Sequence, residues 1–156
     1  MQLKTFSLVW AVLFSAMAWG QNETAANEQI AWITIEEAYA KTLADPQPKK
    51  LFIDVYTDWC GWCKVMDRKT FANPEVARYM NAHYYMVKFN AEQREDVEIL
   101  GNTFKYVERG RGGYHELAAL LLNGQLSYPT VVFMNAKFEI ISPVPGFHEA
   151  GEFLNI

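Results

Sequence analysis

The sequence predicts an α/β fold, in which a central mixed β-sheet is flanked by helices. An apolar run at 51–56, rich in β-branched and aromatic residues, leads into a helical segment at 63–69 that contains no Pro or Gly. The strand-like run at 84–90 can pair in parallel with this first strand, because a helical crossover joins them. The segments 130–135 and 138–141 have the pattern of a β-hairpin, which adds antiparallel strands.

A short strand near 30–32 and a helix at 35–43 are predicted before the central strand. Thr34 and Glu37 form a capping box, in which each side chain accepts the other residue's backbone N–H. Apolar residues recur at helical spacing in this segment: Ile35, Ala38, Tyr39 and Leu43. The run Asp45-Pro46-Gln47-Pro48 ends the helix.

A further helix is predicted after the 63–69 segment. Asn73 is its N-cap, Pro74 occupies its first position, and it runs to about residue 81. Three residues are expected on its inward face: Val76, Tyr79 and Met80. After the hairpin, Gly146 precedes a final helix at 148–156, which is short for an isolated helix.

The segment 91–128 is longer than the predicted fold requires. We expect a helix at 95–100, a strand at 104–107, and a helix at 115–122 that Asn123-Gly124 ends. The run Arg109-Gly110-Arg111-Gly112-Gly113 is interpreted as a solvated loop. A phosphate cradle would need a helix directly after the glycines and a Lys-Ser/Thr step, and the sequence has neither. A second interpretation is that the insertion shapes a partner-binding surface near the cysteines.

The only two cysteines, Cys60 and Cys63, stand between the central strand and its helix. A helix N-terminus favours the thiolate through its unpaired N–H groups and its dipole, and thiol pKa values in such motifs fall to roughly 3.5–7.5. We therefore expect Cys60, exposed at the tip, to attack a partner disulfide, and Cys63 to resolve the product. The alternative is a purely structural disulfide, but a disulfide that closes so small a loop adds little stability.

Several segments, in order, resemble the thioredoxin superfamily. They are Asp54, Trp59-Cys60-Gly61-x-Cys63-Lys64, Val87-Lys88-x-Asn90, Tyr128-Pro129-Thr130, Pro145-Gly146 and Glu152-Phe153-Leu154. The likeness covers roughly residues 30–156, with an unmatched insertion before the cis-proline strand. Met66-Asp67 and Thr70-Phe71 make the active-site helix most similar to secreted thioredoxin-like proteins and to the C-terminal domain of membrane disulfide reductases. The resemblance implies a thioredoxin fold and a protein-disulfide oxidoreductase that needs no cofactor.

The resemblance also implies roles for two other residues. Asp54 matches the buried acid behind the resolving cysteine, which accepts that cysteine's proton through a water. A buried carboxyl group has a raised pKa, which suits a general base near neutral pH. The structural alternative is that Asp54 pairs with Lys88 and holds the sheet together; the two roles are compatible. Pro129 matches the cis-proline that packs against the cysteines, whereas a trans proline would only start an edge strand.

Four more residues complete the expected substrate-binding set. In the family, the backbone of the residue before the cis-proline, here Tyr128, pairs with the substrate chain like an added strand. Its ring is expected to narrow the groove or to donate a hydrogen bond to the nucleophilic sulfur. Trp59 and Gly61 belong to the matched active-site segment. Trp62 stands where thioredoxin has proline, so it affects the reduction potential or contacts partner proteins.

The composition limits the classes of partner. The chain has a net charge of −4, so it lacks the basic surface that nucleic acid requires. It is 51% hydrophobic, which is ample for one packed domain. Its three histidines are scattered and no second cysteine pair exists, so we expect no metal site. Nothing in the sequence indicates a dimerisation segment, and a monomer is expected.

Residues 1–20 are interpreted as a secretory signal peptide. Lys4 precedes an apolar run at 6–19, which is shorter than the roughly 20 residues that span a bilayer. A cut before Gln21 is expected, a cut after Ala18 is the alternative, and an uncleaved membrane anchor is the third possibility. Residues 21–29 would then be a disordered leader, and 30–156 a thioredoxin-like domain in the periplasm or outside the cell.

These expectations together predict an exported enzyme that reduces disulfides in partner proteins by dithiol exchange. A membrane electron-transfer partner is expected to recharge the cysteines. One alternative is a thioredoxin-fold binding or adaptor module without turnover. Another is a disulfide isomerase or oxidase, because a potential difference of about 30 mV, worth about 1.4 kcal/mol, cannot be read from a sequence.

Overall fold

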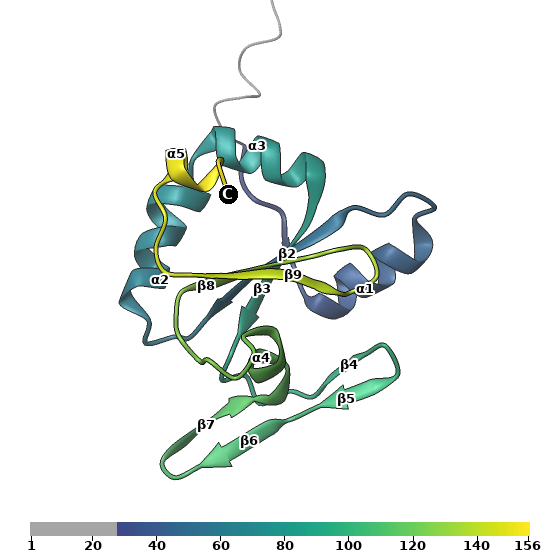
Figure 1. Cartoon of the computed structure of the whole chain (residues 1–156), viewed down its shortest axis with the longest axis vertical. Helices are drawn as coiled ribbons and strands as arrows, with labels where there is room; N and C mark the ends of the chain where they lie inside the picture. The colour runs from purple at the N-terminus through teal and green to yellow at the C-terminus, as the bar shows by residue number, and fades with distance from the viewer. Residues whose placement is uncertain (1–27) are drawn as a thin grey trace, which may run out of the picture.

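The computed structural model describes residues 28–156, and its centre is a five-stranded sheet in the order β1-β3-β2-β8-β9 (Figure 1). The strands are β1 (Trp32–Ile33), β2 (Lys50–Tyr56), β3 (Tyr84–Asn90), β8 (Thr130–Met134) and β9 (Ile140–Pro145). The first three strands are mutually parallel, and β8 is antiparallel to both β2 and β9. The sheet is therefore mixed, which confirms the predicted α/β class. The expected signal peptide and most of the leader lie outside the described residues.

Helices cover both faces of this sheet. They are α1 (Ile35–Ala44), α2 (Gly61–Met66), a π-helix (Asp67–Phe71), α3 (Pro74–His83), α4 (Glu116–Leu121) and α5 (Ala150–Phe153). Alternate residues of β2 enter two separate hydrophobic cores, because successive side chains of a strand point to opposite faces. Leu51 and Ile53 pack with α1 and α4, whereas Phe52 packs with α2, α3 and α5. Asp54 lies on the same face of β2 as Phe52, because the two residues are two positions apart in the strand.

The predicted N-terminal caps of α1 and α3 are confirmed. The Thr34 capping box and the Asn73 cap with Pro74 at its first position are both present. One of the three residues predicted on the inward face of α3 is not there: Val76 and Met80 are buried, but Tyr79 is 47% exposed. The buried stripe includes Ala77 instead. The helix is therefore rotated away from the predicted face, and the Tyr79 ring lies on the outside against His83.

The helix predicted at 63–69 is two elements. After Met66 the chain continues as a π-helix, in which the Ala72 N–H bonds the Asp67 carbonyl five residues back. The Thr70 hydroxyl donates to the His148 carbonyl at 2.5 Å, which ties this widened turn to the segment before α5. Widened turns of this kind are rare and occur frequently at functional sites.

The insertion differs most from its prediction. The expected helix at 95–100 is wrong, because β4 (Val97–Ile99) pairs with β5 (Asn102–Phe104) in a hairpin. Leu100 and Gly101 both have positive φ at its turn. The expected strand at 104–107 is broken at Lys105, where β5 ends and β6 (Tyr106–Arg109) begins. The expected loop at 109–113 is the tip of a second hairpin, completed by β7 (Gly112–His115).

Smaller differences from the prediction occur near the two ends of the described chain. The first strand lies at 32–33 rather than 30–32, and β9 continues to Pro145. The last helix, α5, has 4 residues, well short of the predicted 148–156. As predicted, Asn123 and Gly124 follow the end of α4, and both have positive φ. None of the helices in residues 28–156 is long and apolar enough to cross a bilayer.

Candidate active site

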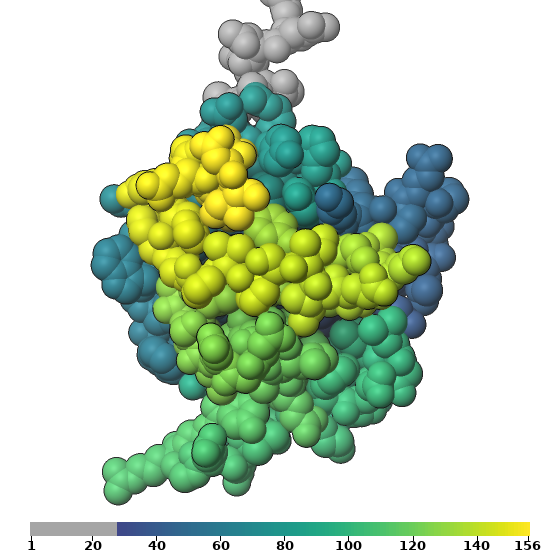
Figure 2. Space-filling view, viewed as in Figure 1, coloured from purple at the N-terminus to yellow at the C-terminus, as the bar shows by residue number. Residues whose placement is uncertain are grey.

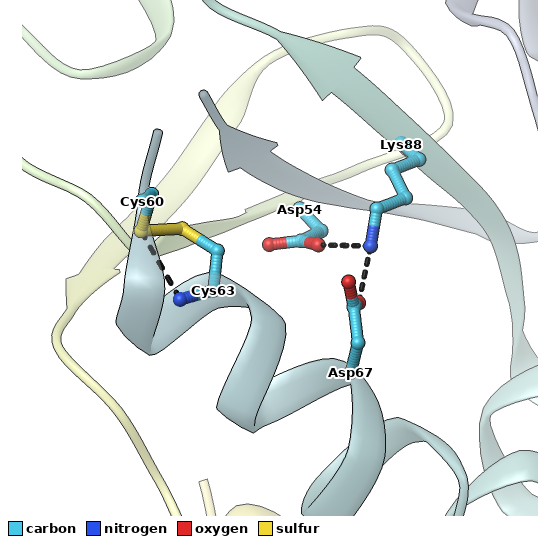
Figure 3. Close-up of polar contacts among 5 residues, drawn as sticks. All are labelled: Asp54, Cys60, Cys63, Asp67 and Lys88. Atoms are coloured by element: carbon cyan, nitrogen blue, oxygen red, sulfur yellow. Dashed lines mark hydrogen bonds and ion pairs between the residues drawn. A yellow bond between two sulfur atoms is a disulfide. The ribbon is translucent and has the colours of Figure 1, made fainter. Parts of the chain in front are cut away.

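Cys60 and Cys63 form a disulfide at the start of α2, with their Cα atoms 5.4 Å apart (Figure 3). Cys60 is the N-cap of this helix, and its sulfur accepts the Cys63 backbone N–H at 3.1 Å. The sulfur thus takes the place of the side-chain oxygen that usually accepts an unpaired N–H at a helix start. When the disulfide is reduced, the same N–H can donate to the Cys60 thiolate and stabilise its charge.

The expected exposure of Cys60 is wrong. Cys60 is only 4% exposed and Cys63 only 3% exposed, so both residues of the disulfide are buried. The position of Cys60 at a helix start follows from the local sequence. Its burial comes from the surrounding segments, which local sequence does not reveal.

Asp54 is the charged group buried behind the cysteines. It is 1% exposed on β2, directly opposite Lys88 on β3, and its Oδ2 atom lies 3.1 Å from Lys88 Nζ. Lys88 also contacts Asp67, so one ammonium group bridges two carboxylates (Figure 3). The second carboxylate oxygen, Asp54 Oδ1, is buried and has no hydrogen-bond partner among the described residues. The predicted pairing of Asp54 with Lys88 is confirmed.

Burial governs the protonation of Asp54. Loss of hydration raises the pKa of its carboxyl group to about 6, and the attraction of Lys88 only partly offsets this rise. Lys88 has a raised pKa, because the two carboxylates outweigh its own burial. Lys88 and Asp67 line a cavity of about 470 Å³ between Glu28, Trp32 and Pro74. The linked charges of Asp54, Lys88 and Asp67 therefore extend from behind the cysteines to this cavity.

Trp59 lies beside the disulfide and is 67% exposed. Its indole N–H donates to the Glu92 carboxylate at 3.0 Å, and its ring packs edge-on against Tyr128 with centroids 5.8 Å apart. Burial and the nearby Glu92 charge raise the pKa of Tyr128 to about 12. No hydrogen bond joins the Tyr128 hydroxyl to the Cys60 sulfur in the described structure, so the ring contacts Trp59 instead.

On the other side of the site, Trp62 is 62% exposed and packs against Phe147, with ring centroids 5.5 Å apart. Between the two cysteines Gly61 is open, since a Cβ there would meet nothing within 4 Å. Pro129 is buried, its peptide bond to Tyr128 is cis, and its carbonyl accepts the Gly146 N–H at 2.8 Å. β8 begins at the next residue and lies between β2 and β9, so it is not an edge strand.

Two residues of this site, Glu92 and Phe147, were not predicted from the sequence. Glu92 follows the end of β3 by two residues, and Trp59 follows the end of β2 by three. The carboxyl ends of parallel strands meet at one edge of a sheet, so this proximity could have been inferred from the predicted topology. Phe147 had no such signal. Within residues 28–156, no three His, Cys, Asp or Glu side chains gather as a metal site would require.

Comparisons with known proteins agree with this geometry. The Thiol:disulfide interchange protein DsbD of Cronobacter sakazakii is 28% identical over 134 residues, which are 84% of this chain and 20% of that protein. The uncharacterized protein B0495.5 of Caenorhabditis elegans is 33% identical over 90 residues, 57% of this chain and 12% of that protein. The chain spans 10% to 22% of the length of these and six further curated relatives.

Among solved structures, the DsbH oxidoreductase superposes with a TM-score of 0.60 at 17% identity, covering 87% of each chain. This likeness confirms the thioredoxin fold. The family model Thioredox_DsbH, described as a protein of unknown function (DUF255), matches residues 21–142. The chain thus has a thioredoxin fold, is similar in sequence to part of the thiol:disulfide interchange protein DsbD, and belongs to the Thioredox_DsbH (DUF255) family.

Proposed function

We propose that this chain is an exported thiol–disulfide oxidoreductase that reduces disulfides in partner proteins. One observation carries the proposal: Cys60 and Cys63 are joined at the start of α2, where the Cys60 sulfur accepts a helix N–H at 3.1 Å. This position lowers the pKa of a thiol and makes it a better nucleophile and leaving group. A buried staple closing so short a loop would add little stability.

The reaction starts from the reduced pair. The Cys60 thiolate attacks one sulfur of the partner disulfide, so a Cys60–partner bond forms while the partner's second sulfur leaves as a thiolate. Cys63 then loses its proton and attacks Cys60, which releases the first partner sulfur. The partner gains two electrons, and the protein ends in the oxidised state described above.

Asp54 is proposed to accept the proton of Cys63. Its pKa of about 6 leaves the carboxylate ionised at neutral pH, so it is free to accept a proton. The same pKa lies close enough to neutral pH for the carboxyl group to release that proton again. The unpartnered Oδ1 atom supports this role, because it has room for one more hydrogen bond (Figure 3). Lys88 holds the other oxygen, so the proton acceptor faces away from the ion pair.

The substrate is proposed to lie against Tyr128, Pro129, Trp59, Gly61 and Trp62. The backbone groups of Tyr128 make no hydrogen bond within the described residues and can pair with an extended substrate strand. The open surface of Gly61 and the exposed ring of Trp62 border the same helix start. Pro129 has no N–H that would compete for the substrate backbone.

Export to the periplasm or the exterior is supported by the apolar run at 6–19. In that compartment, a dithiol donor must return two electrons to Cys60 and Cys63, and we propose a membrane electron-transfer partner for this step. The direction of exchange rests on the reduction potential, since an isomerase or oxidase would have a higher one. Equilibration with glutathione buffers measures this potential.

Trapping tests the whole proposal. A Cys63→Ala variant should hold partner proteins as mixed disulfides at Cys60, while Cys60→Ala, its matched control, should hold none. The wild type should reduce a test protein disulfide in the presence of a dithiol donor. Absence of adducts together with absence of reduction would favour a binding or adaptor module.

A further inference from the structure

A hairpin of the insertion stands apart from the body of the protein. We call residues 106–115, which comprise β6 and β7, the arm. Its strands pair with each other and with no strand of the main sheet. The arm projects at the lower left of Figures 1 and 2, on the side where the chain enters α2. Residues 108–112 at its tip are exposed.

Specific packing gives the arm a defined shape. The Tyr106 ring lies over Gly113, where a Cβ would come within 2.5 Å of the ring. The Arg94 guanidinium lies over the same ring, 4.5 Å from its centroid. At the tip Gly110 has a φ of +63°, a conformation that favours glycine and suits a two-residue hairpin turn. A merely solvated connection would need none of these contacts.

The base of the arm is attached to the edge of the sheet that carries the cysteines. The His115 N–H donates to the Ala91 carbonyl at 2.7 Å, and the Ala91 N–H donates to the carbonyl of Tyr56, the last residue of β2. The next residue, Glu92, holds the Trp59 indole beside the disulfide. The base of the arm is therefore fixed, through Ala91, to the end of β2 that precedes the cysteines.

The tip carries unpaired positive charge. Along the insertion, Glu108 pairs with Arg94 and Lys105 pairs with Asp96. Arg109 and Arg111 are exposed and make no ion pair with any described residue. The whole chain has a net charge of −4, so this positive tip is opposite in sign to the rest of the molecule. Charges placed in this way select and orient an oppositely charged partner.

We propose that the arm binds an acidic segment of the protein whose disulfide Cys60 attacks. This inference rests on the function proposed above and adds the chemistry that selects the substrate. The substrate chain extends from Cys60 past Trp59, and its carboxylates meet Arg109 and Arg111. Arginine suits this role because its planar fork can hold a carboxylate through two hydrogen bonds.

A pair of peptides tests the inference. Each carries one cysteine as a mixed disulfide with thionitrobenzoate, followed by a Gly-Ser spacer of graded length and a run of either glutamates or glutamines. The Cys60 thiolate of a reduced Cys63→Ala protein attacks the peptide sulfur, a Cys60–peptide disulfide forms, and thionitrobenzoate leaves as a coloured anion. At the best spacer length, we expect the acidic peptide to react about fivefold faster at low salt.

The arm variant Arg109→Gln/Arg111→Gln, made in the same background, should abolish this preference and leave the neutral peptide's rate unchanged. The matched control Lys41→Gln/Arg78→Gln removes two exposed positive charges from α1 and α3, and it should retain the preference. Equal rates for both peptides at every spacer length, or an equal loss of preference in the control, would overturn the docking role. If neither peptide reacts with the Cys63→Ala protein whose arm is unchanged, then Cys60 is not the nucleophile and the proposed function itself is wrong.

Discussion

Replacing Asp54 by Asn should stabilise the oxidised protein at pH 7. Asp54 is 1% exposed, and its pKa rises from an ordinary value of 3.8 to about 6 because burial removes its hydration. At about 1.4 kcal/mol per pKa unit, ionising the folded protein at neutral pH costs about 3 kcal/mol relative to the unfolded chain. Asn keeps an oxygen that can accept the Lys88 hydrogen bond and never ionises, so most of this cost should disappear.

The pH dependence has a definite sign. Between pH 3.8 and 6 the folded state binds more protons at Asp54 than the unfolded state, so this residue stabilises the fold at low pH. That contribution is lost as the pH rises through about 6. Wild type and Asp54→Asn should therefore have similar stability near pH 4, and the variant should gain up to about 3 kcal/mol by pH 7.

Urea unfolding of the disulfide-bonded proteins, at steps from pH 4 to pH 8, measures the difference. Asp58→Asn is the matched control, because it removes one exposed charge close by and should change the stability by less than about 0.5 kcal/mol. A variant that is less stable than the wild type by the same amount at every pH would refute the argument. The bond to Lys88 would then outweigh the cost of burying the charge.

Three further predictions concern other parts of the fold. Thr34→Ala removes the cap of α1 and should lower the free energy of unfolding by about 1 kcal/mol, measured in urea; no change would mean that the cap is redundant. His115 is buried, accepts the Leu117 N–H, and has a pKa lowered by burial. Because the unfolded chain binds a proton at this residue more readily than the folded protein, wild-type stability should fall as the pH drops below about 6.5. His115→Ala should lose about 2 kcal/mol at pH 8 and less at pH 5, and a constant difference would contradict this. Gly113→Ala would place a Cβ 2.2 Å from the Val107 carbonyl oxygen, so limited proteolysis should cut the arm first while the core stays intact.

Much of the site was predictable because its determinants are local. Spacing in the chain places Cys60 at the N-terminus of a helix and Cys63 one helical turn later, and both positions are as predicted, although β2 ends at Tyr56, before the cysteines. The Thr34 and Asn73 caps depend on residues only a few positions apart. Parallel pairing opposite β3 puts Lys88 next to Asp54, and alternation along the strand puts both on one face.

The insertion shows where local patterns were misread. The segment 97–99 alternates buried, exposed, buried, which is the period of a strand, but three residues are too few to outweigh a helical interpretation. The two adjacent residues with positive φ, Leu100 and Gly101, decide the hairpin. Because leucine rarely adopts that conformation, its side chain gave no indication of the turn.

By itself, the sequence determined the α/β class, the order of the main elements and the identity of the cysteine pair at the helix start, because each depends on neighbours within a few residues. Only the tertiary structure decided that Cys60 is almost completely buried and that Phe147 borders the site. It also decided that one oxygen of Asp54 is left without a partner. These features arise where segments distant in the chain meet, since solvent exclusion and charge pairing depend on distances in space rather than along the sequence.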